Sequence, residues 1–259
     1  MKRLFDHHAG EHLDVDGACL YCEEAGDPQG QALVLLHGGF GTMEDFNGLL
    51  AAVAGDFHVH AIDFRGHGRS TLGYDRLCYA RLAQDVAQFI AYRGLRNPAM
   101  VGINDGGVIA YRLAAEADLG IARAVAIGAS WDISHRAASR QELATITGAS
   151  WRTRHPDAYH AYQRLNPHPD FDGLAEVVVG MWLDDTPAGY PGPAVERIAC
   201  PLLVVRGDSD RYMPRHAAVD LVDRVSGAQL LNIPSAGAAV LEDAAEIAVS
   251  CIKRFLVAA

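Results

Sequence analysis

The sequence lacks several features that would point to a particular partner or compartment. It has no excess of positive charge, because 22 lysines and arginines stand against 32 aspartates and glutamates, a formal net charge of −10. Nucleic acids and anionic membranes attract basic surfaces, so neither is expected as a partner. No apolar run reaches the roughly 18–20 residues of a membrane-spanning helix, and the first residues lack the apolar stretch of a signal peptide. We therefore expect a cytoplasmic protein.

Cysteine is scarce as well. The five cysteines are odd in number and scattered along 259 residues, which argues against a disulfide framework. Cys19 and Cys22 have the C-x-x-C spacing of some metal sites, but they fall in an expected strand, where residues three apart point to opposite faces. We interpret both as core residues, and the sequence predicts no metal site.

What is present is the material for a large core. Half of the residues are apolar, and runs of strand length alternate with helical patterns, which predicts an α/β fold with a doubly wound, mainly parallel sheet. An opening hairpin is expected over residues 12–24. Further strands are expected at residues 32–37, 58–62, 98–103, 123–128, 201–206 and 229–233. Helices are expected at residues 43–54, 74–93, 105–117, 215–225 and 244–256.

Between residues 130 and 195 this alternation stops. All three tryptophans lie there, together with four histidines and several prolines. We interpret this stretch as a helical cap inserted into an α/β core made of residues 1–129 and 196–259. An aromatic cap over a cleft is typical of small-molecule pockets. The cap residues expected to bind substrate are Trp131, Asp132, His135, Trp151 and Trp182.

Residues 98–114 are the centre of the predicted fold. They read as a short strand, a glycine-rich turn and a helix, with Gly102 and Gly106 two residues to either side of Asn104. A sharp strand-to-helix turn needs a positive φ at its apex and neighbours without side chains. Asparagine is one of the few residues that tolerates such a φ. We therefore predict a positive φ at Asn104.

Five short motifs occur in the order and spacing of a known superfamily. They are residues 35–39 (LLHGG), 63–70 (DFRGHGRS), 102–107 (GINDGG), 207–210 (GDSD) and 233–237 (IPSAG). The chain thereby resembles the α/β-hydrolases, in the capped branch that contains esterases and lipases. The resemblance implies an α/β-hydrolase fold and covers nearly the whole chain outside the cap.

The resemblance also implies a catalytic serine, an acid and a histidine, in that order along the chain. Asp210 matches the acid, but the serine position is held by Asn104 and the histidine position by Ala238. No histidine follows His216, so a shift of alignment does not restore one. Asp210, left without a histidine and without a cationic partner, is expected to have a raised pKa and to act as a base.

The family's oxyanion hole consists of backbone N–H groups, so it does not depend on these two side chains. It would be formed by the N–H of Asp105 and by that of Gly39 or Phe40. His37 belongs to a loop near the cleft and is included among the substrate-binding positions with Ala238, although the usual role of His37 is structural. Asp105 is a candidate proton-transfer group. It is a less favoured candidate nucleophile, as in haloalkane dehalogenases, because that assignment shifts the register of the turn.

Loss of the serine or the histidine of such a set lowers turnover by roughly 10⁶, so ester hydrolysis is not the expected activity. We favour a cofactor-free, non-hydrolytic enzyme, a lyase, a cyclase or a C–C bond-forming enzyme, acting on a carbonyl-containing small molecule. Relatives in the superfamily do such work, often in specialised metabolism. The alternatives are a catalytically inactive small-molecule binder or receptor, and an inactivated variant of an ordinary esterase. The expected oligomeric state is a monomer or a homodimer.

Overall fold

An eight-stranded sheet runs through the molecule, which is described over residues 4–258 by a computed structural model. The strands lie in the order β1-β2-β4-β3-β5-β6-β7-β8, and β2 alone runs against the others. The expected α/β class and mainly parallel sheet are therefore confirmed. The strands are β1 (Glu11–Val15), β2 (Ala18–Gly26), β3 (Gln31–Leu36), β4 (Phe57–Ile62), β5 (Ala99–Ile103), β6 (Arg123–Ile127), β7 (Leu202–Gly207) and β8 (Gln229–Ile233).

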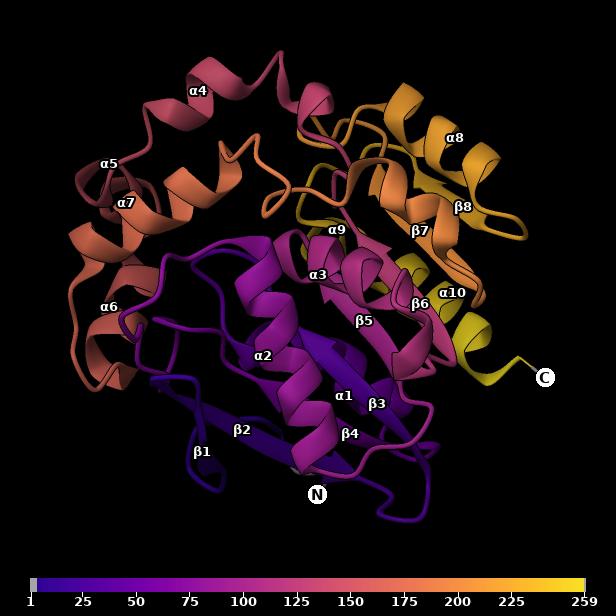
Figure 1. The fold of residues 1–259 in the computed structure, drawn as a ribbon, viewed down its shortest axis with the longest axis horizontal. Coiled ribbons are helices and arrows are strands. Elements are labelled where there is room, and N and C mark those ends of the chain that lie inside the picture. Colours follow the sequence, from indigo (N-terminus) through magenta and orange to yellow (C-terminus); the bar gives the residue numbers. More distant parts are fainter. Residues whose placement is uncertain (1–3, 259) are drawn as a thin grey trace.

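Helices cover both faces of this sheet (Figure 1). One face packs against α2 (Tyr79–Tyr92), α3 (Asp105–Ala114) and α8 (Arg215–Arg224). The other packs against α1 (Asn47–Val53) and α10 (Ala245–Val257). Central strands such as β3 and β7 bury consecutive residues on both faces, which is why their sequences are continuous apolar runs rather than alternating ones.

Two helices begin later than the sequence predicts. The helix expected over residues 74–93 begins at Tyr79, because Cys78 has extended backbone and its Sγ accepts the N–H of Arg81 at 3.4 Å. Tyr74 is 99% exposed. The helix expected over residues 43–54 is divided into a 3₁₀ turn, η1 (Met43–Phe46), and α1, since Thr42 caps the turn with its side chain. The hydrophobic spacing located both helices but did not show where the caps lie.

The chain between β6 and β7 forms a layer of short helices beside the sheet, coloured rose to orange in Figure 1. The helices are η3 (Ile133–Arg136), α4 (Arg140–Ala144), α5 (Gly148–Arg154), α6 (Pro156–Leu165), α7 (Phe171–Trp182) and η4 (Gly192–Arg197); a last short helix, α9 (Val240–Asp243), follows β8. Within residues 4–258, no helix is both long and apolar enough to cross a membrane. All five cysteines are free thiols.

The turn between β5 and α3 depends on two glycines. Asn104 has a φ of 47° and a ψ of −107°, which confirms the predicted positive φ. A Cβ on Gly102 would lie 2.1 Å from the carbonyl oxygen of Gly106, and one on Gly106 would lie 1.9 Å from that of Leu36. Side chains at either position would therefore push α3 away from β5 and β3.

We predict that Gly106→Ala lowers the free energy of unfolding by about 3 kcal/mol or more, because the added methyl group collides with backbone that cannot move aside. Urea denaturation measures the loss. The matched control is Gly48→Ala in α1, where a Cβ would meet nothing within 4 Å. That change should be neutral or stabilising by up to about 1 kcal/mol. Equal effects of the two substitutions would contradict the close packing described above.

Candidate active site

A cavity of 330 Å³ opens at the turn that carries Asn104. Its walls come partly from loops of the sheet and partly from the helices between β6 and β7. The lining residues are Gly39, Asn104, Asp105, Arg136, Leu143, Ile146, Trp151, Arg154, His155, Trp182, Tyr212, Ala238 and Ala239. A mostly apolar and aromatic surface with a few charged groups is typical of a small-molecule pocket.

Three groups from different loops surround Gly128, the residue after β6. A Cβ at Gly128 would lie 3.1 Å from Oδ1 of Asn104, 3.3 Å from the carbonyl oxygen of Ala238 and 3.3 Å from Oδ2 of Asp210. Gly128 has a φ of 61°, so it supplies both the left-handed backbone and the open space. The structure thus brings together the three positions at which the resemblance implies a nucleophile, a histidine and an acid.

Asp210 is held by only one of its two oxygens. Oδ1 accepts the N–H groups of Tyr212 at 2.8 Å and Met213 at 3.1 Å, while Oδ2 is buried and has no hydrogen-bond partner. Burial raises the pKa of this carboxyl above its ordinary value, although the two N–H groups and the charges of Arg136 and Arg206 oppose the rise. The expected rise is confirmed, and within residues 4–258 no salt bridge joins Asp210 to a cation, although the charges of Arg136 and Arg206 act on it.

Asp105 is a second buried carboxylate, with a different environment. Its Oδ1 accepts the hydroxyl of Tyr79 at 2.7 Å, and the indole N–H of Trp182 lies 2.9 and 3.0 Å from its two oxygens. Burial raises its pKa, and these two donors oppose the rise. The side chain of Asp105 therefore ties α3 to α2 and α7 while lining the cavity.

The loop after β3 supplies the other predicted oxyanion donor. The N–H of Phe40 is donated to Nε2 of His67 at 3.1 Å, whereas Gly39 lines the cavity. A Cβ on Gly39 would lie 2.7 Å from Oδ2 of Asp105 and 2.7 Å from the ring of Trp182. Of the two alternatives left open by the sequence, the backbone of Gly39 is the one placed at the cavity.

His37 and His67 act within this loop region as neutral structural groups. In each ring Nδ1 faces a backbone carbonyl, and Nε2 accepts a backbone N–H, that of Phe64 for His37. Burial lowers the pKa of His37 to about 3 and lowers that of His67 as well. His37 is fully buried and does not line the cavity, so the structure places it apart from the other substrate-binding candidates.

The five predicted cap residues lie in three different places. Trp151 and Trp182 line the cavity. Trp131 and His135 do not, because the indole of Trp131 donates to the carbonyl of Ala217 at 2.9 Å and makes an edge-on contact with the ring of His135. These two side chains hold the start of the helical layer against α8.

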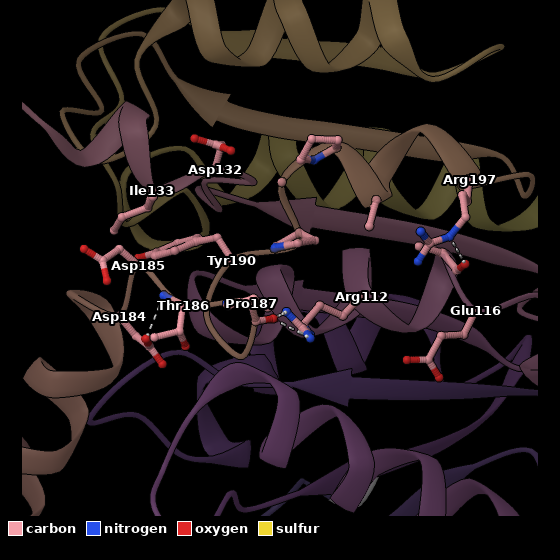
Figure 2. Close-up of a pocket in the computed structure, with 15 residues that line it drawn as sticks. Arg112, Glu116, Asp132, Ile133, Asp184, Asp185, Thr186, Pro187, Tyr190 and Arg197 are labelled. Atoms are coloured by element: carbon pink, nitrogen blue, oxygen red, sulfur yellow. Dashed lines mark hydrogen bonds between the residues drawn. The ribbon is translucent and has the colours of Figure 1, made fainter.

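Asp132 belongs to a different cavity, shown in Figure 2. The lining of this hollow, of 520 Å³, includes Asp132, Ile133, Tyr190, Asp184, Asp185 and Thr186. Arg112 contributes to its wall while donating to the carbonyl of Pro187 at 3.3 Å (Figure 2). Asn104 is not among the residues that line it, so the structure separates Asp132 from the turn.

Sequence reasoning missed Arg136, the most buried cation in the cavity wall. Its Nε has no hydrogen-bond partner, and its guanidinium lies over the rings of Tyr190 at 5.8 Å and Tyr212 at 5.5 Å. The indole nitrogen of Trp151 is likewise buried and unpaired. Arg136 follows His135, which was selected instead; only the geometry of η3 decides which of the two neighbours faces the cavity.

Comparison with known proteins identifies similar sequences. The profile of the alpha/beta hydrolase family matches residues 33–249. A bifunctional esterase/perhydrolase of Acinetobacter calcoaceticus is 32% identical over 226 residues, covering 77% of this chain and 81% of that protein. The 1H-3-hydroxy-4-oxoquinoline 2,4-dioxygenase of Pseudomonas putida is 34% identical over 96 residues, which span only 37% of this chain and 36% of the dioxygenase.

Solved structures show the same fold. The enol-lactonase of Burkholderia xenovorans LB400 superposes with a TM-score of 0.76 at 20% identity. The match covers 96% of this chain and 100% of the lactonase. At that identity the likeness concerns the fold alone.

We predict that Trp182→Phe destabilises the protein by about 1–3 kcal/mol at neutral pH, because a buried carboxylate loses its indole donor. Loss of the donor raises the pKa of Asp105 further. A carboxyl with a raised folded pKa destabilises the fold as pH rises through that pKa, so the loss should be larger at pH 8 than at pH 5. Chemical denaturation at the two pH values measures it.

The control is Trp131→Phe, which also removes one indole N–H. The acceptor that loses its hydrogen bond there is a neutral carbonyl, that of Ala217. The cost of this substitution should not depend on pH. A pH-independent loss in Trp182→Phe would mean that Asp105 does not carry the charge assigned to it.

Proposed function

We propose that this chain, which belongs to the alpha/beta hydrolase family, is a non-hydrolytic enzyme. It would work without a cofactor and form an enolate from a carbonyl-containing small molecule. The proposal rests chiefly on the arrangement around Gly128. There a carboxamide and a methyl group, those of Asn104 and Ala238, stand where a hydrolase of this family would need a hydroxyl and an imidazole. An enolate can serve as the intermediate of lyase, cyclase and C–C bond-forming reactions, which are the reactions expected from the sequence.

The substrate oxygen would be held by backbone N–H groups. Those of Gly39 and Asp105 border the cavity, and the N–H of Asp105 belongs to the first turn of α3, whose N–H groups have no acceptor within the helix. The positive end of the helix dipole also favours negative charge at this point. As the substrate loses a proton, negative charge develops on its oxygen, and these donors stabilise that charge more than they stabilise the neutral carbonyl. Asn104 can add its side-chain N–H.

Asp210 would remove the proton next to the carbonyl. Its unpaired Oδ2 and its raised pKa are what a general base needs, since a carboxylate of ordinary pKa holds a proton too weakly to take one from carbon at neutral pH. Asp210 is not itself a lining residue of the cavity, but it lies around Gly128 with Asn104 and Ala238, which are, and Arg136 lines the same cavity with an unpaired Nε. Its charge would attract a substrate that is an anion or becomes one.

We predict that the protein accelerates deuterium exchange at the carbon beside the carbonyl of 2-tetralone, a bicyclic enolisable ketone, in D₂O, as followed by proton NMR. Asp210→Asn should slow this exchange by about 10²–10⁴, the usual contribution of a general base. The matched control is Asp208→Asn in the same loop, whose carboxylate pairs with Arg215 at the surface. If the parent protein binds the ketone but exchange proceeds only at the rate seen in buffer, the protein is a binder and not this enzyme.

The exchange should also depend on pH with a definite sign. Asp210 acts only when ionised, so the rate should rise with pH through its raised pKa and then level off. An aspartate of ordinary pKa, about 3.9, would already give a flat profile above about pH 5. A rate that does not rise with pH anywhere between about pH 3 and about pH 8 would remove Asp210 from the role of base.

We further predict that Asn104→Ser combined with Ala238→His produces a measurable esterase, assayed with p-nitrophenyl acetate and by fluorophosphonate labelling. The parent and both single variants should give almost no turnover or label, because serine and histidine act as a unit. Addition of Asp210→Asn to the double variant should remove most of the gained activity. A folded double variant without turnover or label would contradict the assignment of positions 104, 238 and 210 to one catalytic set.

A further inference from the structure

Two histidines and a glutamate meet near the amino ends of the parallel strands, at the opposite end of the sheet from the Asn104 turn. His58 and His60 are two residues apart on β4, so their side chains leave the same face of the strand. Glu24 of β2 is the register partner of His60 across the antiparallel pair. The three side chains therefore occupy adjacent positions on one face of two hydrogen-bonded strands, near the beginning of β4 (Figure 1).

The distances among these groups suit a small cation. Oε2 of Glu24 lies 3.1 Å from Nε2 of His58 and 3.9 Å from Nδ1 of His60, and one ligand atom of each residue falls within 4.8 Å of the others. A tetrahedral Zn²⁺ with bonds of about 2.0–2.1 Å holds neighbouring ligand atoms about 3.3–3.5 Å apart. Of the two printed distances, one is slightly shorter than this spacing and the other slightly longer, so changes of side-chain rotation would be needed to bring all three atoms to it.

The buried side chain of His60 gives evidence for a bound ligand that does not depend on the distances. Its ring is 2% exposed, and neither Nδ1 nor Nε2 has a hydrogen-bond partner. Buried imidazole nitrogens are normally paired, because an unpaired polar atom loses the hydrogen bonds that water would give it. The ring is tilted against that of His58, with the centroids 4.2 Å apart, and lies steeply inclined to that of Phe89, which offers no strong acceptor or donor. A bound cation would use one of these nitrogens.

We propose that Glu24, His58 and His60 bind a Zn²⁺ ion, with water as the fourth ligand. Two imidazoles and a carboxylate favour zinc over Mg²⁺ or Ca²⁺, which prefer oxygen ligands. Glu24 and the partly exposed His58 leave the ion open to solvent. The neighbouring cation, Arg93, is engaged with Glu11 and with Sγ of Cys22. The ion would join β2 to β4 and so fix the antiparallel hairpin to the parallel part of the sheet.

The site is tested by isothermal titration of the metal-stripped full chain with Zn²⁺. The parent should bind one equivalent, and binding should persist in excess Mg²⁺. His60→Leu and His58→Gln should each weaken it by at least 100-fold, while His160→Ala, which alters an exposed histidine on α6, should leave it unchanged. Saturating Zn²⁺ should raise the midpoint of thermal unfolding of the parent and of His160→Ala, and not that of the other two.

Substitution of Co²⁺ shows which atoms bind the metal. Nitrogen and oxygen ligands give the visible bands of tetrahedral cobalt without the near-ultraviolet charge-transfer absorption of a thiolate. His58→Gln alters a partly exposed side chain, so the variant should stay folded, which circular dichroism checks. Its loss of Zn²⁺ binding then reports the loss of a ligand and not unfolding. No binding by the parent, full binding by His58→Gln, or a thiolate band would each overturn the proposal.

Discussion

The backbone contact between α3 and the end of β3 is the constraint on which the rest of the site depends. The N–H of Gly106 donates to the carbonyl of His37 at 3.0 Å, and a side chain at Gly106 would occupy the space of the neighbouring carbonyl. Because the helix begins directly against two strands, Asn104 is forced outward at the carboxyl edge of the sheet. The first N–H groups of α3 then border the same cavity as the loop that contains Gly39.

Two buried carboxylates near this turn show how environment separates groups of the same type. Asp105 is surrounded by neutral donors, Tyr79 and Trp182, and is fixed between three helices. Asp210 has backbone donors on one oxygen and none on the other. Burial raises both pKa values, but only Asp210 keeps an oxygen without a donor. Asp105 is therefore suited to a structural role, and Asp210 to a chemical one.

The sequence predicted the fold well, because its signals are local and repeated. Continuous apolar runs located the strands of the parallel sheet, and Gly102 and Gly106 located the sharp turn, since few arrangements other than close backbone packing need two glycines there. Helix starts were less accurate, because a cap such as Cys78 acts through one hydrogen bond that periodicity does not reveal.

The candidate site was predictable where it depends on the core and much less so where it depends on the helical layer. Asp210 and Ala238 follow strands of the core, so their order along the chain predicts that they lie close together. Trp131 and Trp182 have the same chemistry in the sequence, yet one packs on α8 and the other on Asp105. Arg136 was overlooked because short helices joined by loops have no period from which an inward face can be read.

Phe40 has a consequence for how the cavity can open. This residue has a φ of 60°, and its ring contacts those of Trp151, Phe171 and Trp182 on three sides. It also follows Gly39 directly, so the aromatic cluster and the candidate oxyanion donor share one stretch of backbone. Any displacement of α5 or α7 that admits a ligand would pull on that stretch. The backbone position of the Gly39 N–H would therefore depend on where α5 and α7 lie, through the ring contacts of Phe40.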